Sequence, residues 1–128
     1  MIYGTGIDIL AIKRISEMSK KMGWALAHSV LGHKELEVYA DLVDGKRLAD
    51  NYLARRFAAK EAFVKASRIE GLDVRHVQVL NHESGEPYLM LSGKAFLQMG
   101  GLEWRHHVTI SDSDDYVVAS VVCERGDK

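Results

Sequence analysis

Two carboxylates stand at positions where a charged side chain needs a partner. Asp8 lies between Ile7 and Ile9 in a segment whose composition is typical of a strand. Glu61 follows Phe57 by four residues and shares the apolar stripe of a long helical segment. Burying an unpaired charge is costly, so each carboxylate predicts a cation or hydrogen-bond donors opposite it. Together with phosphate and water oxygens, the two would form a site for a hard cation such as Mg²⁺.

Each carboxylate also has an ordinary structural interpretation. Asp8 precedes a helical segment and is a candidate for capping it. Glu61 stands four residues before Lys65, so the two are candidates for an ion pair on the helix surface. The sequence alone leaves both interpretations open.

Three basic residues accompany Glu61 on the same helical segment. Arg56 and Lys60 are four residues apart, and Lys65 lies one turn further on. Arginine binds phosphate in a bidentate manner and lysine binds it as a point charge, so this spacing suits a polyphosphate. A solvated helix face has the same pattern and stays an alternative.

Polar residues alternate with apolar ones near the C-terminus. His107, Thr109 and Ser111 fall on one face of a predicted strand, and Val108 and Ile110 fall on the other. With an ordinary pKa near 6.5, a histidine there is able to accept a proton or bind phosphate, although a half-exposed strand has the same alternation. The other histidines show no zinc-ligand spacing.

The elements that must position these residues can be read from periodicity. The pattern predicts an α+β domain with a mainly antiparallel sheet packed against the long helix. The expected elements are a strand at 2–10, helices at 11–22 and 24–39 with an interruption at Gly32, a loop at 41–47, the long helix at 48–68, strands at 76–80 and 88–91 joined by a turn, a short helix at 93–99, and strands at 107–110 and 116–122.

Composition narrows the class of protein. A length of 128 residues fits a single domain spanning 1–128, and 47% hydrophobic residues are enough for a core. The 17 basic and 18 acidic residues give a net charge of −1, which does not predict nucleic acid as a partner. No apolar run approaches the roughly 18 residues of a membrane helix, so we expect no membrane association and a cytoplasmic location. The single cysteine, Cys123, is expected to be a buried strand residue.

Three motifs resemble a known family, the small holo-acyl-carrier-protein synthases of the 4′-phosphopantetheinyl transferase superfamily. The segment G-T-G-I-D-I at 4–9, followed by K-R-I at 13–15, is similar to the opening of that family. R-R-F-A-A-K-E-A-F-V-K-A at 55–66 is similar to its long helix, and H-V-T-I-S at 107–111 to its strand before the last one. The motifs occur in the family's order and span nearly the whole chain.

The resemblance implies a fold and a site. It implies the 4′-phosphopantetheinyl transferase fold, with Mg²⁺ held by Asp8 and Glu61 against the diphosphate of coenzyme A. It also implies a coenzyme A site lined by six further residues, which are named below. Two of them, Lys65 and His107, are expected to take part in catalysis together with Asp8 and Glu61. These further residues are Arg56, Lys60, Lys65, Gly85, Pro87 and His107.

The implied reaction is the Mg²⁺-dependent transfer of 4′-phosphopantetheine from coenzyme A to a serine of apo acyl carrier protein, which releases adenosine 3′,5′-bisphosphate. The base that accepts the serine proton is left open between a metal-bound water, Glu61 and His107. A carrier protein of lipid metabolism is implied, and both the fatty acid and the polyketide types stay open. Family members form homotrimers with active sites between subunits, and the acidic carrier protein docks on the helix after Asp8, here through Lys13, Arg14, Lys20 and Lys21.

The sequence departs from the family pattern in three places. Residues 67–71 read S-R-I-E-G where relatives commonly have a glycine-rich loop. Glu86 stands where many have lysine, and Asp112 where many have histidine. A member that binds coenzyme A or carrier protein without transfer is therefore an alternative, whereas a nucleic-acid-binding module has little support from the charge.

Overall fold

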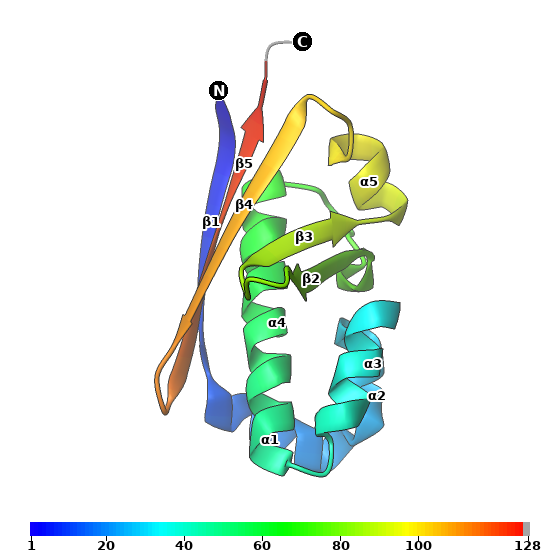
Figure 1. Cartoon of the computed structure of the whole chain (residues 1–128), viewed down its shortest axis with the longest axis vertical. Helices are drawn as coiled ribbons and strands as arrows, with labels where there is room; N and C mark the ends of the chain where they lie inside the picture. The colour runs from blue at the N-terminus through cyan, green and yellow to red at the C-terminus, as the bar shows by residue number, and fades with distance from the viewer. Residues whose placement is uncertain (127–128) are drawn as a thin grey trace.

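A computed structural model describes residues 1–126 and forms two layers around one long helix (Figure 1). The chain order is β1 (Ile2–Ala11), α1 (Ile12–Met22), α2 (Trp24–Val30), α3 (His33–Leu42), α4 (Lys46–Ser67), a 3₁₀ turn η1 (Val74–His76), β2 (Val77–Asn81), β3 (Pro87–Leu91), α5 (Gly93–Met99), β4 (Trp104–Asp112) and β5 (Tyr116–Arg125). The predicted α+β class is confirmed.

The strands form two antiparallel sheets rather than one. β1, β5 and β4 make a three-stranded sheet with β5 in the centre, and β2 and β3 make a separate hairpin. Both predicted hairpins are confirmed. The pairing of β1 with β5 joins the two ends of the chain, and periodicity had not predicted it because it depends on residues more than 100 positions apart.

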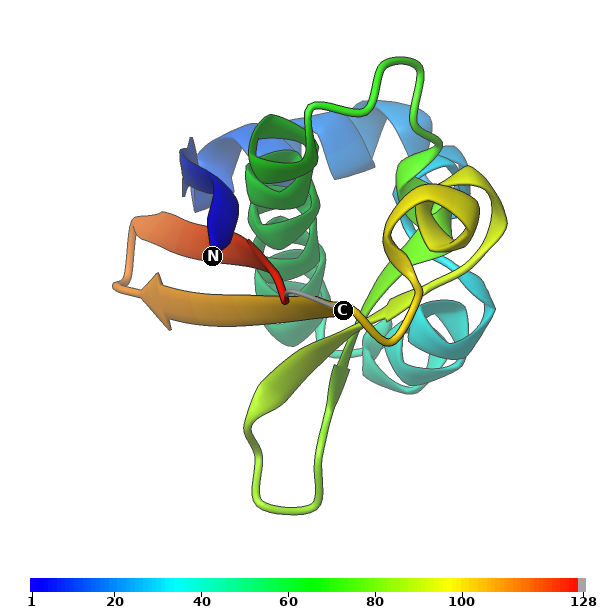
Figure 2. The same ribbon diagram turned by 90° about the horizontal axis from the view of Figure 1, so that it is seen from above.

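Helix α4 lies between the three-stranded sheet on one side and α3 with the β2–β3 hairpin on the other (Figure 1). Its alanines Ala54, Ala58, Ala62 and Ala66 are fully buried, and such small side chains allow strands to approach closely. Figure 2 shows the turn of the β2–β3 hairpin projecting away from α4 and the three-stranded sheet.

The remaining differences from the predicted elements have local causes. The second helical stretch is divided at Leu31 and Gly32, as expected, but α3 continues to Leu42 and α4 begins at Lys46, so the predicted loop is short. Strand β4 is nine residues long because it pairs with β5 along its whole length. No helix within residues 1–126 is long and apolar enough to cross a membrane.

Candidate functional site

One face of β1 lies directly against α4. Gly4, Gly6 and Asp8 alternate along the strand and so project from the same face, whereas Ile7 and Ile9 project from the other. A side chain at Gly6 would clash with the carbonyl oxygen of Ala62. The two glycines therefore allow a backbone contact that carries Asp8 to the side of the helix.

Asp8 forms an ion pair with Lys65. The Lys65 Nζ donates to Asp8 Oδ1 at 3.2 Å and to the Ile7 carbonyl oxygen at 2.8 Å. The Asp8 side chain is 19% exposed, so it remains open to solvent. The capping interpretation is wrong, because helix α1 is preceded by Ala11 and has no side-chain cap.

Glu61 lies one turn before Lys65 on α4 and is partly exposed. Within residues 1–126 its carboxylate makes neither a hydrogen bond nor an ion pair, so the surface pair with Lys65 does not form and Lys65 instead contacts Asp8. Lys65 thus stands four residues after the Glu61 carboxylate on its own helix and contacts the Asp8 carboxylate of β1. We call Asp8, Glu61 and Lys65 the carboxylate half-site.

The carboxylate half-site is suitable for a hard cation. It offers two separate carboxylates, neither fully buried, and one of them has no protein partner in the described part of the chain. No group of three or more His, Cys, Asp or Glu side chains with metal-binding geometry occurs within residues 1–126. A bound cation would therefore take its remaining ligands from a substrate and from water.

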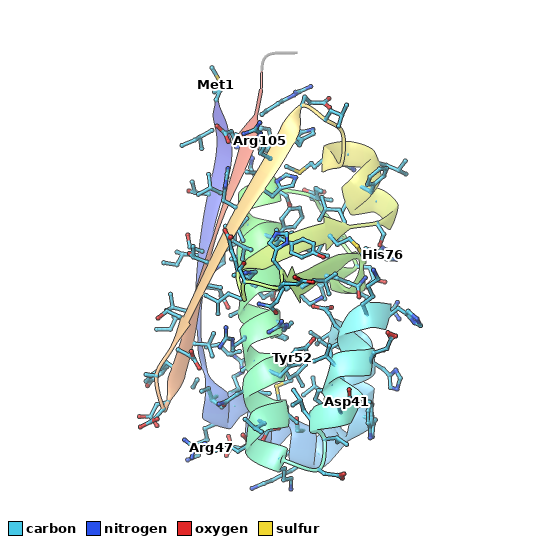
Figure 3. The ribbon with its side chains drawn as sticks, viewed as in Figure 1. Met1, Asp41, Arg47, Tyr52, His76 and Arg105 are labelled. Atoms are coloured by element: carbon cyan, nitrogen blue, oxygen red, sulfur yellow. The ribbon has the colours of Figure 1, made fainter. Side chains whose placement is uncertain are left out.

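A second group of predicted residues surrounds Arg56 on another side of α4. Arg56 is 6% exposed, its Nη2 donates to Asn81 Oδ1 at 2.6 Å, and its guanidinium lies 4.1 Å from the Tyr52 ring centre. Burial lowers the pKa of Arg56 and raises the pKa of Tyr52 to about 12. Figure 3 shows Tyr52 pointing from α4 toward α3, where its hydroxyl donates to the Glu35 carbonyl oxygen at 3.3 Å.

Asn81 joins Arg56 to the hairpin turn. Its Nδ2 donates to the Gly85 carbonyl oxygen at 2.8 Å, and Asn81 pairs with Pro87 in the β2–β3 register. Gly85 has a φ of +95°, which a residue with a side chain adopts only with strain. The structure thus brings Arg56, Gly85 and Pro87 together through Asn81, which the sequence analysis did not single out.

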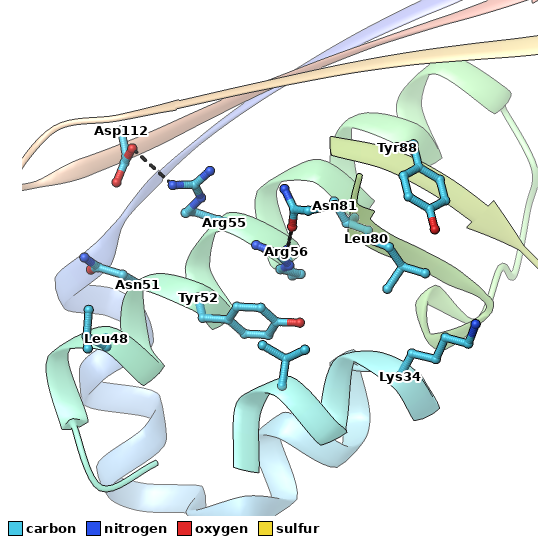
Figure 4. A pocket seen from close by; sticks show the side chains of 12 residues that line it. Lys34, Leu48, Asn51, Tyr52, Arg55, Arg56, Leu80, Asn81, Tyr88 and Asp112 are labelled. Atoms are coloured by element: carbon cyan, nitrogen blue, oxygen red, sulfur yellow. Dashed lines mark hydrogen bonds and ion pairs between the residues drawn. The ribbon is translucent and has the colours of Figure 1, made fainter. Parts of the chain in front are cut away.

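Arg56 and Asn81 border a cleft of about 690 Å³, within the range of small-molecule sites (Figure 4). Figure 4 shows Arg55 directed toward Asp112 and Arg56 toward Asn81. We call this cleft the cationic cleft. Its lining is formed by Lys34, Val38, Leu48, Asn51, Tyr52, Arg55, Arg56, Val79, Leu80, Asn81, Tyr88 and Asp112.

Lys60 lies in the core rather than at the surface of the cationic cleft. Its Nζ donates hydrogen bonds to Glu35 Oε1 at 2.6 Å, to the Val77 carbonyl oxygen at 2.8 Å and to the Val74 carbonyl oxygen at 3.0 Å. The side chain is 1% exposed, and all three ammonium donors are used. In this arrangement Lys60 supports the fold and has no donor left for a phosphate.

His107 projects from the outer face of the three-stranded sheet. Its Nε2 lies 3.1 Å from Glu124 Oε1, and this hydrogen bond lowers the pKa of Glu124. Thr109 and Ser111 are exposed on the same face, as their alternation predicts. Asp8 projects from the inner face of that sheet, so the chain does not bring His107 and Asp8 to one surface.

The two groups on α4 lie on opposite sides of the helix. Arg56 and Lys65 are nine residues apart. An α-helix turns by about 100° per residue, so nine residues make about two and a half turns and place the two side chains on opposite sides. Their partners agree with this geometry, because Arg56 contacts β2 and Lys65 contacts β1. Within one chain, the cationic cleft and the carboxylate half-site therefore face different directions.

The expected partner surface is exposed on α1. Lys13, Arg14, Lys20 and Lys21 are all exposed, and Lys13 and Lys20, seven residues apart, lie on one face of the helix. These two residues border a groove of about 640 Å³ that also includes Lys46 and Arg47 at the start of α4.

Comparisons with known proteins give a consistent result. The family model of the 4′-phosphopantetheinyl transferase superfamily matches residues 4–121. The chain is 41% identical to a holo-[acyl-carrier-protein] synthase of Burkholderia lata, over 96% of this chain and 89% of that protein. It is 40% identical to one of Burkholderia mallei, over 98% of this chain and 91% of that protein.

Solved structures of similar proteins share the fold. The crystal structure of holo-[acyl-carrier-protein] synthase from Neisseria meningitidis matches with a TM-score of 0.85 and 38% identity, covering 98% of this chain and 100% of that one. The structure of a holo-(acyl-carrier-protein) synthase from Bacillus anthracis, a complex with CoA (3′,5′-ADP), matches with a TM-score of 0.78 and 34% identity, covering 98% and 99%. The fold expected from the resemblance is confirmed.

Proposed function

Since the chain belongs to the 4′-phosphopantetheinyl transferase superfamily and is a transferase of the holo-[acyl-carrier-protein] synthase type, we propose the following reaction. The chain transfers 4′-phosphopantetheine from coenzyme A to a serine of apo acyl carrier protein with the help of Mg²⁺. The serine hydroxyl attacks the phosphorus that bears the pantetheine. The bond from that phosphorus to the bridging oxygen breaks, and adenosine 3′,5′-bisphosphate leaves. The observation that carries this proposal is the carboxylate half-site, in which Lys65 contacts Asp8 and stands one helical turn after Glu61.

Asp8 and Glu61 would hold the ion in this reaction. Mg²⁺ bound there would neutralise charge on the diphosphate and favour attack on phosphorus. Lys65 is 55% exposed, so its ammonium is able to reach an oxygen of the diphosphate without leaving this side of α4. The seryl proton has two candidate acceptors among the side chains, Glu61 and His107.

His107 is a suitable candidate because of its partner. If Nε2 donates to Glu124, the neutral ring keeps Nδ1 as an acceptor. The His107 ring projects from the outer face of the sheet, whereas Asp8 of the same chain projects from the inner face. The ring would therefore serve an active site completed by a neighbouring subunit.

The proposal includes a homotrimer with active sites between subunits. Arg56, Gly85 and Pro87 lie on one side of α4 and the carboxylate half-site lies on the other, so a site that uses both needs two chains. Ile7 and Ile9 are 63% and 65% exposed on the outer face of β1, which is a high exposure for two neighbouring isoleucines. The projecting β2–β3 turn would extend the cationic cleft toward a neighbour.

The cationic cleft is the proposed position of the adenosine 3′,5′-bisphosphate part of coenzyme A. Arg55 and Arg56 supply guanidinium groups for phosphate, and Tyr88 offers an aromatic face nearby. The exposed basic side chains of α1 are the proposed contact for an acidic carrier protein. The predicted single domain and cytoplasmic location remain predictions.

The transfer is tested by the mass of apo acyl carrier protein after incubation with coenzyme A. We expect a gain of one phosphopantetheine that depends on Mg²⁺ and is abolished by EDTA, with adenosine 3′,5′-bisphosphate as the second product. Asp8→Asn and Glu61→Gln should each lower the rate about 100-fold or more, because each removes charge from the proposed ion site. Glu70→Gln, at an exposed position after α4, is the matched control and should keep the rate.

Two results would contradict the proposal. An undiminished rate in Asp8→Asn would remove this residue from the reaction. Binding of coenzyme A with no mass gain on any carrier protein would favour the non-catalytic alternative.

A further inference from the structure

The cationic cleft contains three cations and a single carboxylate. Lys34 comes from α3, Arg55 and Arg56 come from α4, and Asp112 is the last residue of β4. Figure 4 shows Asp112 opposite Arg55 at one end of the cleft. The cleft is thus positive overall, and its only negative charge belongs to one residue.

The two guanidinium groups have unused donors. Arg56 is 6% exposed, and its Nε is buried with no hydrogen-bond partner. The Nε of Arg55 is buried and unpartnered as well. Buried donors without partners are uncommon in native proteins, so the protein groups of the described residues leave both guanidinium groups incompletely hydrogen-bonded.

Asp112 engages Arg55 only loosely. The closest contact joins Arg55 Nη1 and Asp112 Oδ1 at 3.5 Å, longer than the roughly 2.7–2.9 Å of a good charge-assisted hydrogen bond. Both side chains are about one-third exposed, so neither is locked in place. An anion with better geometry would therefore compete for Arg55.

We propose that Asp112 weakens anion binding in the cationic cleft by competing for Arg55. The inference rests on the proposed function, in which the cleft receives the adenosine 3′,5′-bisphosphate part of coenzyme A. A phosphate monoester that reaches Arg55 displaces the Asp112 carboxylate and is repelled by it. Asp112 thereby favours release of the bisphosphate product over its retention.

Calorimetric titration with adenosine 3′,5′-bisphosphate tests this inference. Asp112→Asn should lower the Kd about fivefold at 50 mM NaCl, and the gain should shrink at 500 mM NaCl because salt screens charge. Asp112→Glu keeps the charge and should bind within about twofold of the unsubstituted protein.

Asp114→Asn is the matched control, because it removes the same charge from a side chain that is 95% exposed and contacts Arg47 outside the cleft. It should leave the Kd unchanged. In an Arg55→Gln background, Asp112→Asn should tighten binding less than in the unsubstituted protein, since the competition for Arg55 is gone and only the direct repulsion of the anion by Asp112 remains. A general structural effect of the substitution would not depend on Arg55 in this way.

The inference would be overturned if Asp112→Asn bound no more tightly than the unsubstituted protein, or if Asp114→Asn tightened binding equally. The transfer assay separates this failure from failure of the proposed function. Mg²⁺-dependent transfer with an unaltered Kd in Asp112→Asn would reject the role of Asp112 alone. Loss of all transfer in the unsubstituted protein would reject the function.

Discussion

Two lysines five residues apart on α4 illustrate how burial decides what a side chain does. Lys60 is 1% exposed and bonded to Glu35, whereas Lys65 is 55% exposed and contacts Asp8. Burial lowers the pKa of Lys60, and the Glu35 carboxylate opposes this effect. The first lysine is committed to the fold, and the second is available to a ligand.

Glu35 connects three segments of the chain, namely α3 with its preceding residue, α4 and β2. Its Oε1 accepts from Lys60 and from the Gly32 backbone N–H, and its Oε2 accepts from the Val79 backbone N–H at 2.9 Å. Strand β2, which carries Asn81, is thereby fixed against α3 and α4. We infer that this network holds Asn81, and through it Arg56, in position.

Lys60→Met should lower the free energy of unfolding by about 3–5 kcal/mol, because it leaves a buried carboxylate unpaired. Glu35→Gln combined with Lys60→Met should cost less than the sum of the two single substitutions, since both act on one pair. Urea unfolding at a fixed protein concentration measures these differences.

Lys65→Met is the control for this experiment, since its exposed pair with Asp8 should contribute about 1 kcal/mol or less. Equal losses for Lys60→Met and Lys65→Met would show that burial does not distinguish the two lysines.

At the scale of single residues, spacing in the sequence predicted which basic residues share α4. It did not predict which side chains these basic residues contact or how deeply they are buried. The partner of Lys60 stands 25 residues earlier in the chain, and helical periodicity carries no information about such a contact. Glu35 stands three residues after Gly32 and accepts from its backbone N–H, which is one half of a capping box, and this spacing is the feature from which Glu35 could have been found. Asn81 gave no comparable signal, because asparagine is common at turns.

At the scale of elements, the approach of β1 to α4 positions the carboxylate half-site. A side chain at Gly4 would clash with the Ala66 carbonyl oxygen, and one at Gly6 with that of Ala62. Glycine inside a strand is typical of a close backbone approach, and here the approaching backbone is that of the long helix. The identity of that partner required the tertiary fold.

Gly6→Ala should destabilise the protein by about 1–3 kcal/mol, because the added methyl group overpacks a backbone contact. It should also lower transfer activity in the protein that remains folded, since β1 carries Asp8. Thermal unfolding and the transfer assay at a temperature well below the transition measure the two effects.

Gly45→Ala is the matched control for this substitution. A side chain at Gly45 would meet Leu48 Cδ1 at an ordinary 3.5 Å, and the residue has a negative φ of −95°. Equal destabilisation by both substitutions would contradict a special role for the contact between β1 and α4.

At the scale of the whole molecule, the arrangement of the half-sites bears on assembly. The motifs of the sequence indicated one site, but α4 presents the carboxylate half-site and the cationic cleft in different directions, and His107 lies on a third surface. Linear order does not show which side of a helix meets which neighbour. A closed trimer would place the cationic cleft of one subunit against the carboxylate half-site of the next.

Mixing two inactive variants tests this arrangement. Asp8→Asn removes a ligand from the carboxylate half-site and Arg56→Ala removes a phosphate contact from the cationic cleft, so each variant alone should be nearly inactive. Refolded together in equal amounts, random trimers should have about one quarter of their interfaces with both half-sites intact. Transfer should therefore recover to about one quarter of the unsubstituted rate, and sedimentation should show trimers. Trimeric mixtures without recovery would mean that each chain completes its own site.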